Sequence, residues 1–509
     1  MNVDPTMSQI SDSDTAEILF SIGDGAFARA LRRLADAGTI RRIYAGIYTR
    51  NLDSPVEAIV LRNWAAIVSH LLPGAVLAYR SALEQRPVDG VIYVRRGRTR
   101  RKLELPGLVV EVFSGAGAPA LLDPPAPDLL HRTIYLPSEA RGFLENMGAA
   151  RGASRRVLPQ EDIETRLDKI LTIRGDFKLN DLRDQAKAIA EKLDLGAEGK
   201  RFDGIVGALL GTHEEKKLRS KLALARVAGK PYDPDRLELF DVLHGALSGS
   251  VFAHPVDASN RGVALENFAF FEAYFSNFIE GTTFEVEEAE QIVFAGAIIA
   301  NRSEDSHDIL GTFRAASSTP WRNQSASMPD GFLDWLKSVN ALVMQARPDK
   351  RPGQWKEKRN MAGNTLFVLP EQVPATLAEG FERIVSLTDP VARALMTMFV
   401  VSEVHPFQDG NGRTARLAMN CILSEAGMCR IIIPTVYRED YLLPLKRLTN
   451  DRDAVPYVRS MQRIHDWTSR FDYGQQRHDV QRQLARGNAF KEDLRNYRLI
   501  FPDDAASRG

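Results

Sequence analysis

Hydrophobic residues in the second half of the chain recur at helical spacing over long stretches. The segment D-P-V-A-R-A-L-M-T-M-F-V-V-S-E-V, residues 389–404, is apolar on nearly every side and predicts a buried central helix. His405-Pro406 should end this helix, because proline disfavours the helical conformation in the residue before it. The segment T-A-R-L-A-M-N-C-I-L-S-E-A-G restarts a helix that Gly427 ends. Long helical patterns are therefore predicted to dominate residues 260–470, with one interruption at G-N-T-L-F-V-L-P, residues 363–370.

The pattern changes in the first fifty residues, where the predicted elements are short. Residues 15–22, T-A-E-I-L-F-S-I, predict a first helix, and residues 26–38 predict a second, basic helix. Residues 39–50 place β-rich positions around Gly46 and predict a hairpin. Helix, turn, basic helix and small wing are the outline of a winged helix-turn-helix, whose basic helix suits the major groove of DNA. The candidate DNA contacts are Arg29, Arg32 and Arg33. A solvated surface helix explains these arginines equally well.

Five regions are predicted along the chain. We assign them as a winged helix-turn-helix (1–50), a small α/β region (51–160), a charged helical connector (161–234), a large helical domain (235–470) and a polar C-terminal tail (471–509). The predicted fold class is therefore mainly α, with β structure in the N-terminal part. Six basic residues between positions 95 and 102 crowd into one turn of the α/β region. They could contact phosphates or simply be solvated, and both interpretations stay open.

Composition is that of a globular protein. The chain has 509 residues, of which 44% are hydrophobic and 26% charged, and its formal net charge is zero. This length predicts two to four domains. The two cysteines, Cys421 and Cys429, cannot form a disulfide framework and lack companions at zinc-ligand spacing. The N-terminus has no signal-peptide pattern, and no run of eighteen apolar residues predicts a membrane span. We therefore expect a cytoplasmic protein without membrane contact.

Candidate chemistry is concentrated between the two predicted central helices, in H-P-F-Q-D-G-N-G-R-T-A-R. The bare backbone of residues 410–412 can turn sharply and point N–H groups at an anion at a helix N-terminus. Arg413 and Arg416 lie three residues apart, on one side of that helix, and suit an oligophosphate. Asp409 offers an oxygen ligand to Mg²⁺, and His405 can take a proton near neutral pH. These residues predict a site for a nucleotide–Mg²⁺ complex beside a base.

Other interpretations of this stretch are weaker. A single histidine is more often structural than catalytic. G-N-G-R-T-A also fits the dinucleotide pattern G-x-G-x-x-A, but that pattern follows a strand, whereas a helix is predicted here. Arg413 also falls where the dinucleotide turn needs a small residue. The chain has no Walker A motif.

The stretch resembles the signature of the Fic (filamentation induced by cyclic AMP) family, His-x-Phe-x-(Asp/Glu)-Gly-Asn-Gly-Arg-x-x-Arg, at every specified position. The resemblance continues downstream in I-I-I-P-T-V-Y-R-E-D-Y-L-L-P-L and covers residues 235–470. Upstream, G-N-T-L-F-V-L-P-E-Q-V-P resembles the family's flap, a β-hairpin that aligns a target segment. The resemblance implies a helical Fic domain that transfers AMP from ATP to a hydroxyl on a protein.

The resemblance also implies roles for individual residues. His405 would deprotonate the Ser, Thr or Tyr hydroxyl of the target protein, and Phe407 would anchor the loop in the core. Asp409 would hold Mg²⁺ bridging the α- and β-phosphates. Arg413 would stabilise the leaving pyrophosphate, and Arg416 would clamp the γ-phosphate. The implied nucleotide-binding set is Gly410, Asn411, Gly412, Arg413 and Arg416.

A second phrase, S-N-F-I-E-G, resembles the Fic inhibitory motif (Ser/Thr)-x-x-x-Glu-(Gly/Asn) and runs from Ser276 to Gly281. Its place before the signature implies intramolecular inhibition, in which Glu280 reaches Arg416 and takes the place of the γ-phosphate. Alternatively, Glu280 merely ends a helix that Gly281 stops. In some relatives the same glutamate helps to remove AMP, so the reverse reaction also stays open.

Two function classes remain. In the first, the chain is an autoinhibited protein adenylyltransferase that uses ATP and Mg²⁺. In the second, it is a DNA-binding regulator whose Fic domain senses nucleotide or removes AMP. The phrase L-R-R-L-A-D-A-G-T-I-R-R-I-Y-A-G-I-Y resembles the N-terminal region of AbiEi-type antitoxins, which regulate transcription. The expected partners are a protein substrate and DNA, and self-association is common among Fic relatives.

Overall fold

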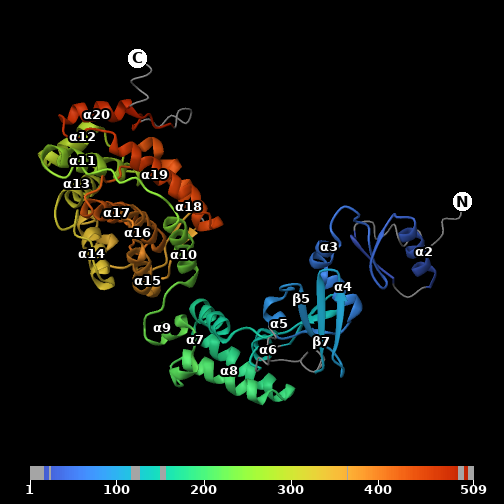
Figure 1. Ribbon diagram of the computed structural model, residues 1–509. Coiled ribbons are helices and arrows are strands. Elements are labelled where there is room, and N and C mark those ends of the chain that lie inside the picture. The colour runs from blue at the N-terminus through green and yellow to red at the C-terminus, as the bar shows by residue number, and fades with distance from the viewer. Residues whose placement is uncertain are drawn as a thin grey trace. The chain divides into compact units, whose positions relative to one another are not determined.

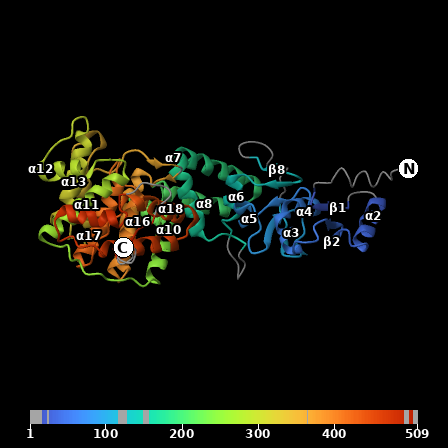
Figure 2. The ribbon, with the colours of Figure 1, turned by 90° about the horizontal axis from the view of Figure 1, so that it is seen from above.

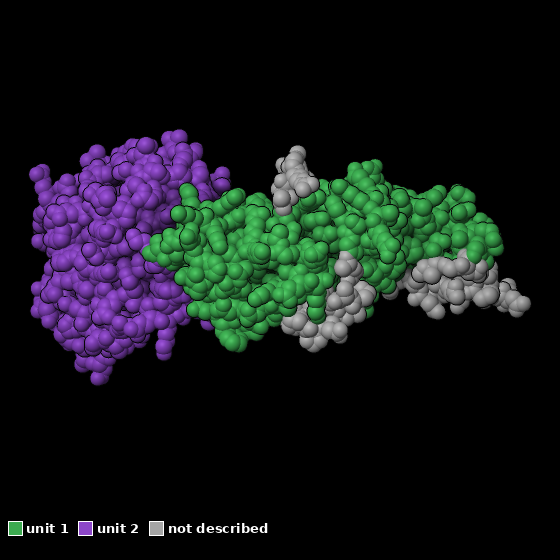
Figure 3. All heavy atoms as spheres, turned by 90° about the horizontal axis from the view of Figure 1, so that it is seen from below, with its two compact units in different colours: residues 1–228 green, residues 229–509 purple. Residues whose placement is uncertain are grey.

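The structure is a computed structural model that describes residues 16–21, 25–115, 127–148, 156–363, 365–490 and 498–502. The chain forms two compact units, residues 1–228 and 229–509, which Figure 3 distinguishes by colour. Among the described residues, both sheets of three or more strands belong to unit 1, whereas unit 2 is helical apart from one short hairpin (Figure 1). The mainly α fold class is confirmed.

Unit 1 begins with a small sheet and a basic helix. The sheet has the strand order β1-β3-β2, and all its pairs are antiparallel. The elements are β1 (Ile18–Phe20), α2 (Gly25–Asp36), β2 (Arg41–Tyr44) and β3 (Ile47–Thr49). Gly46 joins β2 to β3 with a φ of +74°, a conformation that favours glycine. The predicted basic helix and the predicted hairpin are both confirmed.

The helix predicted at residues 15–22 is wrong for the described residues. Ile18–Phe20 form a strand instead, with Ile18 opposite Thr49 and Phe20 opposite Ile47. A short apolar run cannot be assigned to helix or strand by its period alone, and pairing with β3 decides the outcome here. The helix-turn-helix stays a prediction, because residues 1–15 and 22–24 lie outside the described residues.

A six-stranded mixed sheet follows in unit 1, with the order β6-β7-β5-β4-β9-β8. Its strands are β4 (Val76–Leu77), β5 (Val91–Arg95), β6 (Arg101–Leu105), β7 (Leu108–Phe113), β8 (Leu129–His131) and β9 (Ile134–Leu136). The basic turn joins β5 to β6, and Arg101 and Lys102 form the start of edge strand β6. The helices of unit 1 are α3 (Val56–Arg62), α4 (Trp64–Leu71), α5 (Arg80–Glu84), α6 (Glu139–Glu145), α7 (Gln160–Leu193), α8 (Gly196–Leu209) and α9 (Lys221–Val227).

Unit 2 contains the candidate site. Its helices are α10 (Pro234–Ser248), α11 (Gly262–Ile279), α12 (Val286–Ala295), α13 (Ser303–Ser317), α14 (Pro329–Val343), α15 (Val373–Ser386), α16 (Pro390–Val404), α17 (Asn411–Glu425), α18 (Arg438–Asp451), α19 (Val455–Ser469) and α20 (Arg477–Arg486). The hairpin pairs β10 (Met361–Ala362) with β11 (Thr365–Leu366). Short 3₁₀ turns begin at Pro348, Pro370 and Thr435.

Helices α16 and α17 form the centre of unit 2, with the other helices arranged around them (Figures 1 and 2). Most side chains of α16 are buried, which its apolar sequence predicts. Asp389 starts α16 by accepting the N–H groups of Val391 and Ala392, with Pro390 in the first turn. Both central helices are therefore confirmed, together with the loop between them that carries the candidate chemistry.

Both cysteines are free and buried in unit 2. Burial raises the pKa of each thiol to about 12, so neither carries a reactive thiolate at neutral pH. Within the described ranges, no helix is long and apolar enough to cross a bilayer.

Candidate active site

The loop that joins α16 to α17 reverses the chain in two left-handed steps. His405 has a φ of +52°, and its N–H still bonds back into α16. Gly410 has a φ of +76° and precedes the first residue of α17. A Cβ at Gly410 would lie 2.7 Å from Sδ of Met344, so both the space and the backbone require glycine. The loop thereby places a histidine, an aspartate and a helix N-terminus within a few residues of one another.

The imidazole of His405 is oriented by two contacts. Its Nδ1 lies 3.3 Å from the carbonyl oxygen of Ser402. Because a carbonyl only accepts, Nδ1 carries the proton and Nε2 presents a lone pair. The ring also stacks on Phe367, with centroids 3.9 Å apart and 7° between the planes. Burial, with the nearby charge of Lys356 acting in the same direction, lowers the pKa of His405 to about 4. The ring is therefore neutral at neutral pH and able to accept a proton.

The end of α11 holds Arg416. Nε of Arg416 donates to Oγ of Ser276 (2.9 Å), and Nη2 donates to the Ser276 carbonyl (2.9 Å) and to Oε1 of Glu280 (2.7 Å). Glu280 is the C-terminal cap of α11, and 33% of its side chain is exposed. Burial pushes the pKa of Glu280 up, but attraction by Arg416 and Arg413 outweighs burial and lowers it. The pair is ionised at neutral pH.

Glu280 also lies against the first turn of α17. A Cβ at Gly412 would collide with Oε1 of Glu280 and would lie 3.0 Å from its Cδ. The absence of a side chain at position 412 thus leaves room for the carboxylate. The N-terminus of a helix favours anions, because its N–H groups and the helix dipole present positive charge there. Glu280 therefore lies in a position that suits a phosphate oxygen.

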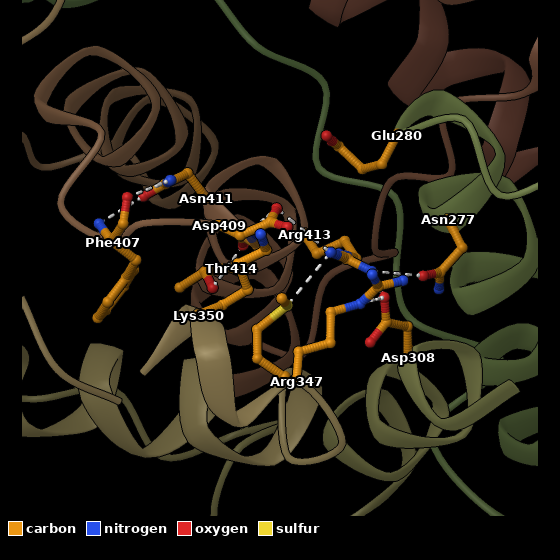
Figure 4. A network of polar contacts seen from close by, with 12 residues as sticks. Asn277, Glu280, Asp308, Arg347, Lys350, Phe407, Asp409, Asn411, Arg413 and Thr414 are labelled. Carbon is orange, nitrogen blue, oxygen red and sulfur yellow. Dashed lines mark hydrogen bonds and ion pairs between the residues drawn. The ribbon is translucent and has the colours of Figure 1, made fainter. Parts of the chain in front are cut away.

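Arg413 is held by a second acid that comes from α13 (Figure 4). Its Nη1 donates to Oδ2 of Asp308 (2.6 Å) and to Oδ1 of Asn277 (3.1 Å), and Nη2 lies 3.2 Å from Sδ of Met344. Oδ2 of Asp308 also accepts from Nε of Arg347 (2.9 Å). Burial raises the pKa of Asp308, and the two arginines oppose that rise. Arg413 is thus fixed between α11 and α13.

Asp409 is the residue of the loop that suits a cation. Its side chain is 42% exposed and lies 3.7 Å from Nη2 of Arg413. One carboxylate oxygen accepts the N–H of Gly410 (2.6 Å). A partly exposed carboxylate fits Mg²⁺, which takes oxygen ligands and keeps several waters when it binds together with phosphates.

Asn411 and Phe407 close the loop on itself. Oδ1 of Asn411 accepts the N–H of Phe407, and Nδ2 of Asn411 donates to the Phe407 carbonyl, both at 2.8 Å. The Phe407 ring is buried and packs against Trp355, with centroids 5.1 Å apart. The side chain of Asn411 is engaged inside the loop, so the part it could offer a phosphate is its backbone N–H.

A model of the Fic/DOC family matches residues 332–423, which include the hairpin, the loop and all but the last two residues of α17. The chain contains a Fic domain. A protein adenylyltransferase Fic of Drosophila erecta is 31% identical over 236 residues, which are 45% of this chain and 46% of that protein. Protein adenylyltransferase fic-1 of Caenorhabditis briggsae is 27% identical over 213 residues, 41% of this chain and 42% of that protein. The chain thus spans about half the length of these curated relatives.

Among solved structures, one match is Fic-1 (residues 134–508) from C. elegans. That structure has a TM-score of 0.35 and 21% sequence identity, and the match covers 63% of this chain and 94% of that one.

The Fic domain brings together most, but not all, of the predicted site residues. The N-terminus of α17 is surrounded by four of them: His405, Asp409, Arg413 and Arg416. The end of α11 contributes two more, Ser276 and Glu280. The arginines predicted to contact DNA lie on α2 in unit 1, where all three are exposed: Arg29, Arg32 and Arg33.

Sequence reasoning missed several residues that contact the site, among them Asn277, Asp308, Lys356 and Phe367. Asn277 lies inside the inhibitory motif and Phe367 inside the flap, so their positions in the sequence could have indicated that they contact the site. Asp308 and Lys356 carry no such signal. Asp308 lies 105 residues before Arg413, and only the tertiary fold brings the two together.

Proposed function

We propose that this chain is a protein adenylyltransferase, which transfers AMP from ATP to a Ser, Thr or Tyr hydroxyl of a protein and is restrained by Glu280. The observation that carries the proposal is the grouping of a neutral imidazole, a partly exposed carboxylate and two arginines around the N-terminus of α17. The name of the curated relatives supports the same activity.

The proposed reaction uses the free nitrogen of His405. Nε2 takes the proton of the target hydroxyl, the hydroxyl oxygen forms a bond to the α-phosphorus of ATP, and the bond to pyrophosphate breaks. Arg413 neutralises the charge that develops on the leaving pyrophosphate. The backbone of residues 410–412 faces the phosphates at the start of α17. Asp409 would hold Mg²⁺, which supplies positive charge to the phosphates. Positioning and charge stabilisation then supply most of the rate.

Inhibition follows from the contact between Glu280 and Arg416. A γ-phosphate needs the guanidinium that Glu280 now engages at 2.7 Å. Nucleotide that binds without this clamp is misplaced, and a displacement of about 1 Å costs about a hundredfold in rate. Ser276 strengthens the restraint, because its hydroxyl and carbonyl both accept from the same arginine. Removal of AMP from the target, in which water takes the place of the protein oxygen on phosphorus, is the alternative proposal for Glu280, because this carboxylate lies against the first turn of α17 where the phosphates would bind.

The hairpin β10–β11 is the proposed docking edge for the target protein. Met361 and Leu366 stand opposite each other on it and are 64% and 49% exposed. An extended segment can pair with such a hairpin through main-chain hydrogen bonds, which makes recognition largely independent of the target's side chains.

A second proposed role concerns unit 1. The exposure of all three arginines on α2, beside the hairpin β2–β3 in the sequence, favours a contact with DNA phosphates. In this role the N-terminal unit is a DNA-binding regulator and the Fic domain acts as its nucleotide-dependent partner. Cytoplasmic location and self-association stay predictions.

The test compares three proteins incubated with Mg²⁺ and radiolabelled ATP: wild type, Glu280→Gly, and Glu280→Gly with His405→Ala. Parallel reactions carry the label on the α- or on the γ-phosphate. We expect α-label on protein that rises in Glu280→Gly and disappears in the double variant, with no γ-label in any reaction. Protein-bound γ-label would indicate phosphorylation instead, and the absence of both labels would reject AMP transfer.

A further inference from the structure

The segment that leads into and out of the hairpin touches the candidate base from two sides. Trp355 forms an isolated antiparallel bridge with Phe407, and the N–H of Lys356 donates to the Pro406 carbonyl (2.9 Å). At the other arm, the N–H of Phe367 donates to the carbonyl of Asn360 (3.2 Å). Asn360 in turn donates from Nδ2 to the Phe407 carbonyl (2.9 Å), and the Phe367 ring stacks on His405, so both arms meet at the loop that carries His405.

Lys356 caps the C-terminal end of α16. Its Nζ donates to the carbonyls of His405 (2.8 Å) and Val404 (3.2 Å) and to Oδ1 of Asn360 (2.7 Å). The last carbonyls of a helix lack partners within the helix, and a cation stabilises them and the negative end of the dipole. The three acceptors use all three donors of the ammonium group. Lys356 thus ties down the left-handed turn at His405 although only 4% of the residue is exposed.

Phe367 holds the side chain that this turn projects. Its ring is almost parallel to the imidazole, at 7°, and the centroids are only 3.9 Å apart. The contact limits rotation of the imidazole about its χ2 bond, while the hydrogen bond from Nδ1 to Ser402 fixes which nitrogen faces out. Phe367 directly follows Leu366, an exposed residue of the docking edge. Phe367 is therefore the one residue between a target segment paired with the hairpin and the imidazole of His405.

We propose that Lys356 and Phe367 are positioning residues for His405: the ammonium holds the backbone of the base, and the phenylalanine ring holds its imidazole. This inference deepens the proposed function, since it rests on His405 being the base. It assigns the hairpin segment a second task besides docking a target. The hairpin keeps the base aligned, so that target docking and alignment of the base are mechanically linked.

The charges around His405 allow a test of Lys356. A lysine that only stabilised the fold would not change the pKa of His405 when it is replaced. Lys356 lowers the pKa of His405, whereas Glu280, Asp409 and the Ser402 carbonyl raise it. Removing the cation should therefore raise the pKa of His405. Burial lowers the pKa of Lys356 itself to about 7, with Arg359 and Arg236 acting in the same direction, so the lysine stays charged throughout a titration of His405 below pH 6.

The first arm is an NMR titration of full-length protein with ¹³C-labelled histidine, without nucleotide. The chain has nine histidines, and the signal that disappears in His405→Ala identifies residue 405. We expect the Lys356→Met variant to raise the pKa of His405, while Lys356→Arg keeps it low. The matched control is Lys358→Met, which removes an exposed lysine two residues away and should change nothing. An unchanged titration in a folded Lys356→Met protein would overturn the role of the lysine.

The second arm measures AMP transfer in the Glu280→Gly background. Lys356→Met and Phe367→Leu should each lower kcat by about tenfold or more, because a misaligned base loses rate steeply. The KM for ATP should not change, since the phosphate-binding groups lie on α17. A raised KM with unchanged kcat would overturn the proposal. If no variant transfers AMP, the proposed function fails, and the NMR arm still decides whether Lys356 acts on His405.

Discussion

Arginine is used in opposite ways on α2 and on α17. The three arginines of α2 are exposed, whereas Arg413 and Arg416 of α17 are only 3% and 4% exposed. A buried cation must have matched partners, because leaving it without them costs several kcal/mol, on the order of 3–5. Each buried arginine must therefore have an acidic partner nearby, and finding that partner locates another residue of the site. An exposed arginine meets water at little cost, so its position alone says much less about function.

The two acids that match the buried arginines also differ. Asp308 is fully buried and shared with Arg347, so it belongs to the fixed framework. Glu280 ends a helix and has a partly exposed side chain, so water can replace its contact at lower cost. Arg413 is therefore held by a buried partner, whereas Arg416 has a partly exposed partner that, we propose, a phosphate displaces. This difference is the physical basis of the proposed inhibition.

The largest effect is expected from removing the base. In the Glu280→Gly background, His405→Ala should lower the rate of AMP transfer by about 10²–10⁴-fold, the usual contribution of a general base. Initial rates of α-label incorporation at saturating ATP provide the measurement. Transfer that persists at the parent rate would show that another group takes the proton.

A stability measurement tests the contrast between the buried arginines of α17 and the exposed arginines of α2. Arg413→Ala should lower the free energy of unfolding of unit 2 by about 3 kcal/mol, since it removes one side of a buried ion pair. The matched control is the triple replacement of the α2 arginines by alanine, which should leave the unfolding transition unchanged. Urea denaturation followed by tryptophan fluorescence measures both. If both changes had equally small effects on the free energy of unfolding, the buried ion pair between Arg413 and Asp308 would not stabilise unit 2 as described.

The pH dependence of transfer sharpens the assignment of the base. With a pKa of about 4, His405 stays neutral as the pH falls from 8 to 5, so transfer should not lose rate through protonation of the base in this range. An imidazole with an ordinary pKa of about 6.5 would lose about thirtyfold by pH 5. Rates of AMP transfer measured in the Glu280→Gly background, with nucleotide–Mg²⁺ kept saturating, distinguish the lowered pKa from the ordinary one. A loss of rate on acidification with a midpoint near 6.5 would contradict the lowered pKa of His405.

The smallest effect on the active site is expected from α2. Replacing Arg29, Arg32 and Arg33 by alanine should leave AMP transfer unchanged, because these residues belong to unit 1. Retention on DNA should weaken, and the salt slope should fall by about one for each DNA phosphate that the variant no longer neutralises. Filter binding at several salt concentrations measures this. If retention and slope stay the same, α2 is an ordinary solvated helix.

Much of the Fic domain could be predicted because local signals agree there. The apolar run of α16, the proline after His405 and the glycine before α17 are local signals, and together they predict two helices and a turn. The contact between Glu280 and Arg416 also matched expectation, since a motif marked both ends. Local signals failed at Ile18–Phe20, where pairing with β3 decides the structure, and at Asp308 and Lys356, whose roles arise only from the folding of distant segments.

Restraint by Glu280 is tested most directly by the rate of AMP transfer when the charge of this residue alone is removed. Glu280→Gln keeps the size of the side chain but cannot form the ion pair with Arg416, and Glu280→Gly removes the side chain altogether. We predict an increase on the order of a hundredfold for glycine, with glutamine intermediate. Rates equal to wild type in both variants, with ATP binding intact, would contradict the claim that Glu280 restrains this site through Arg416.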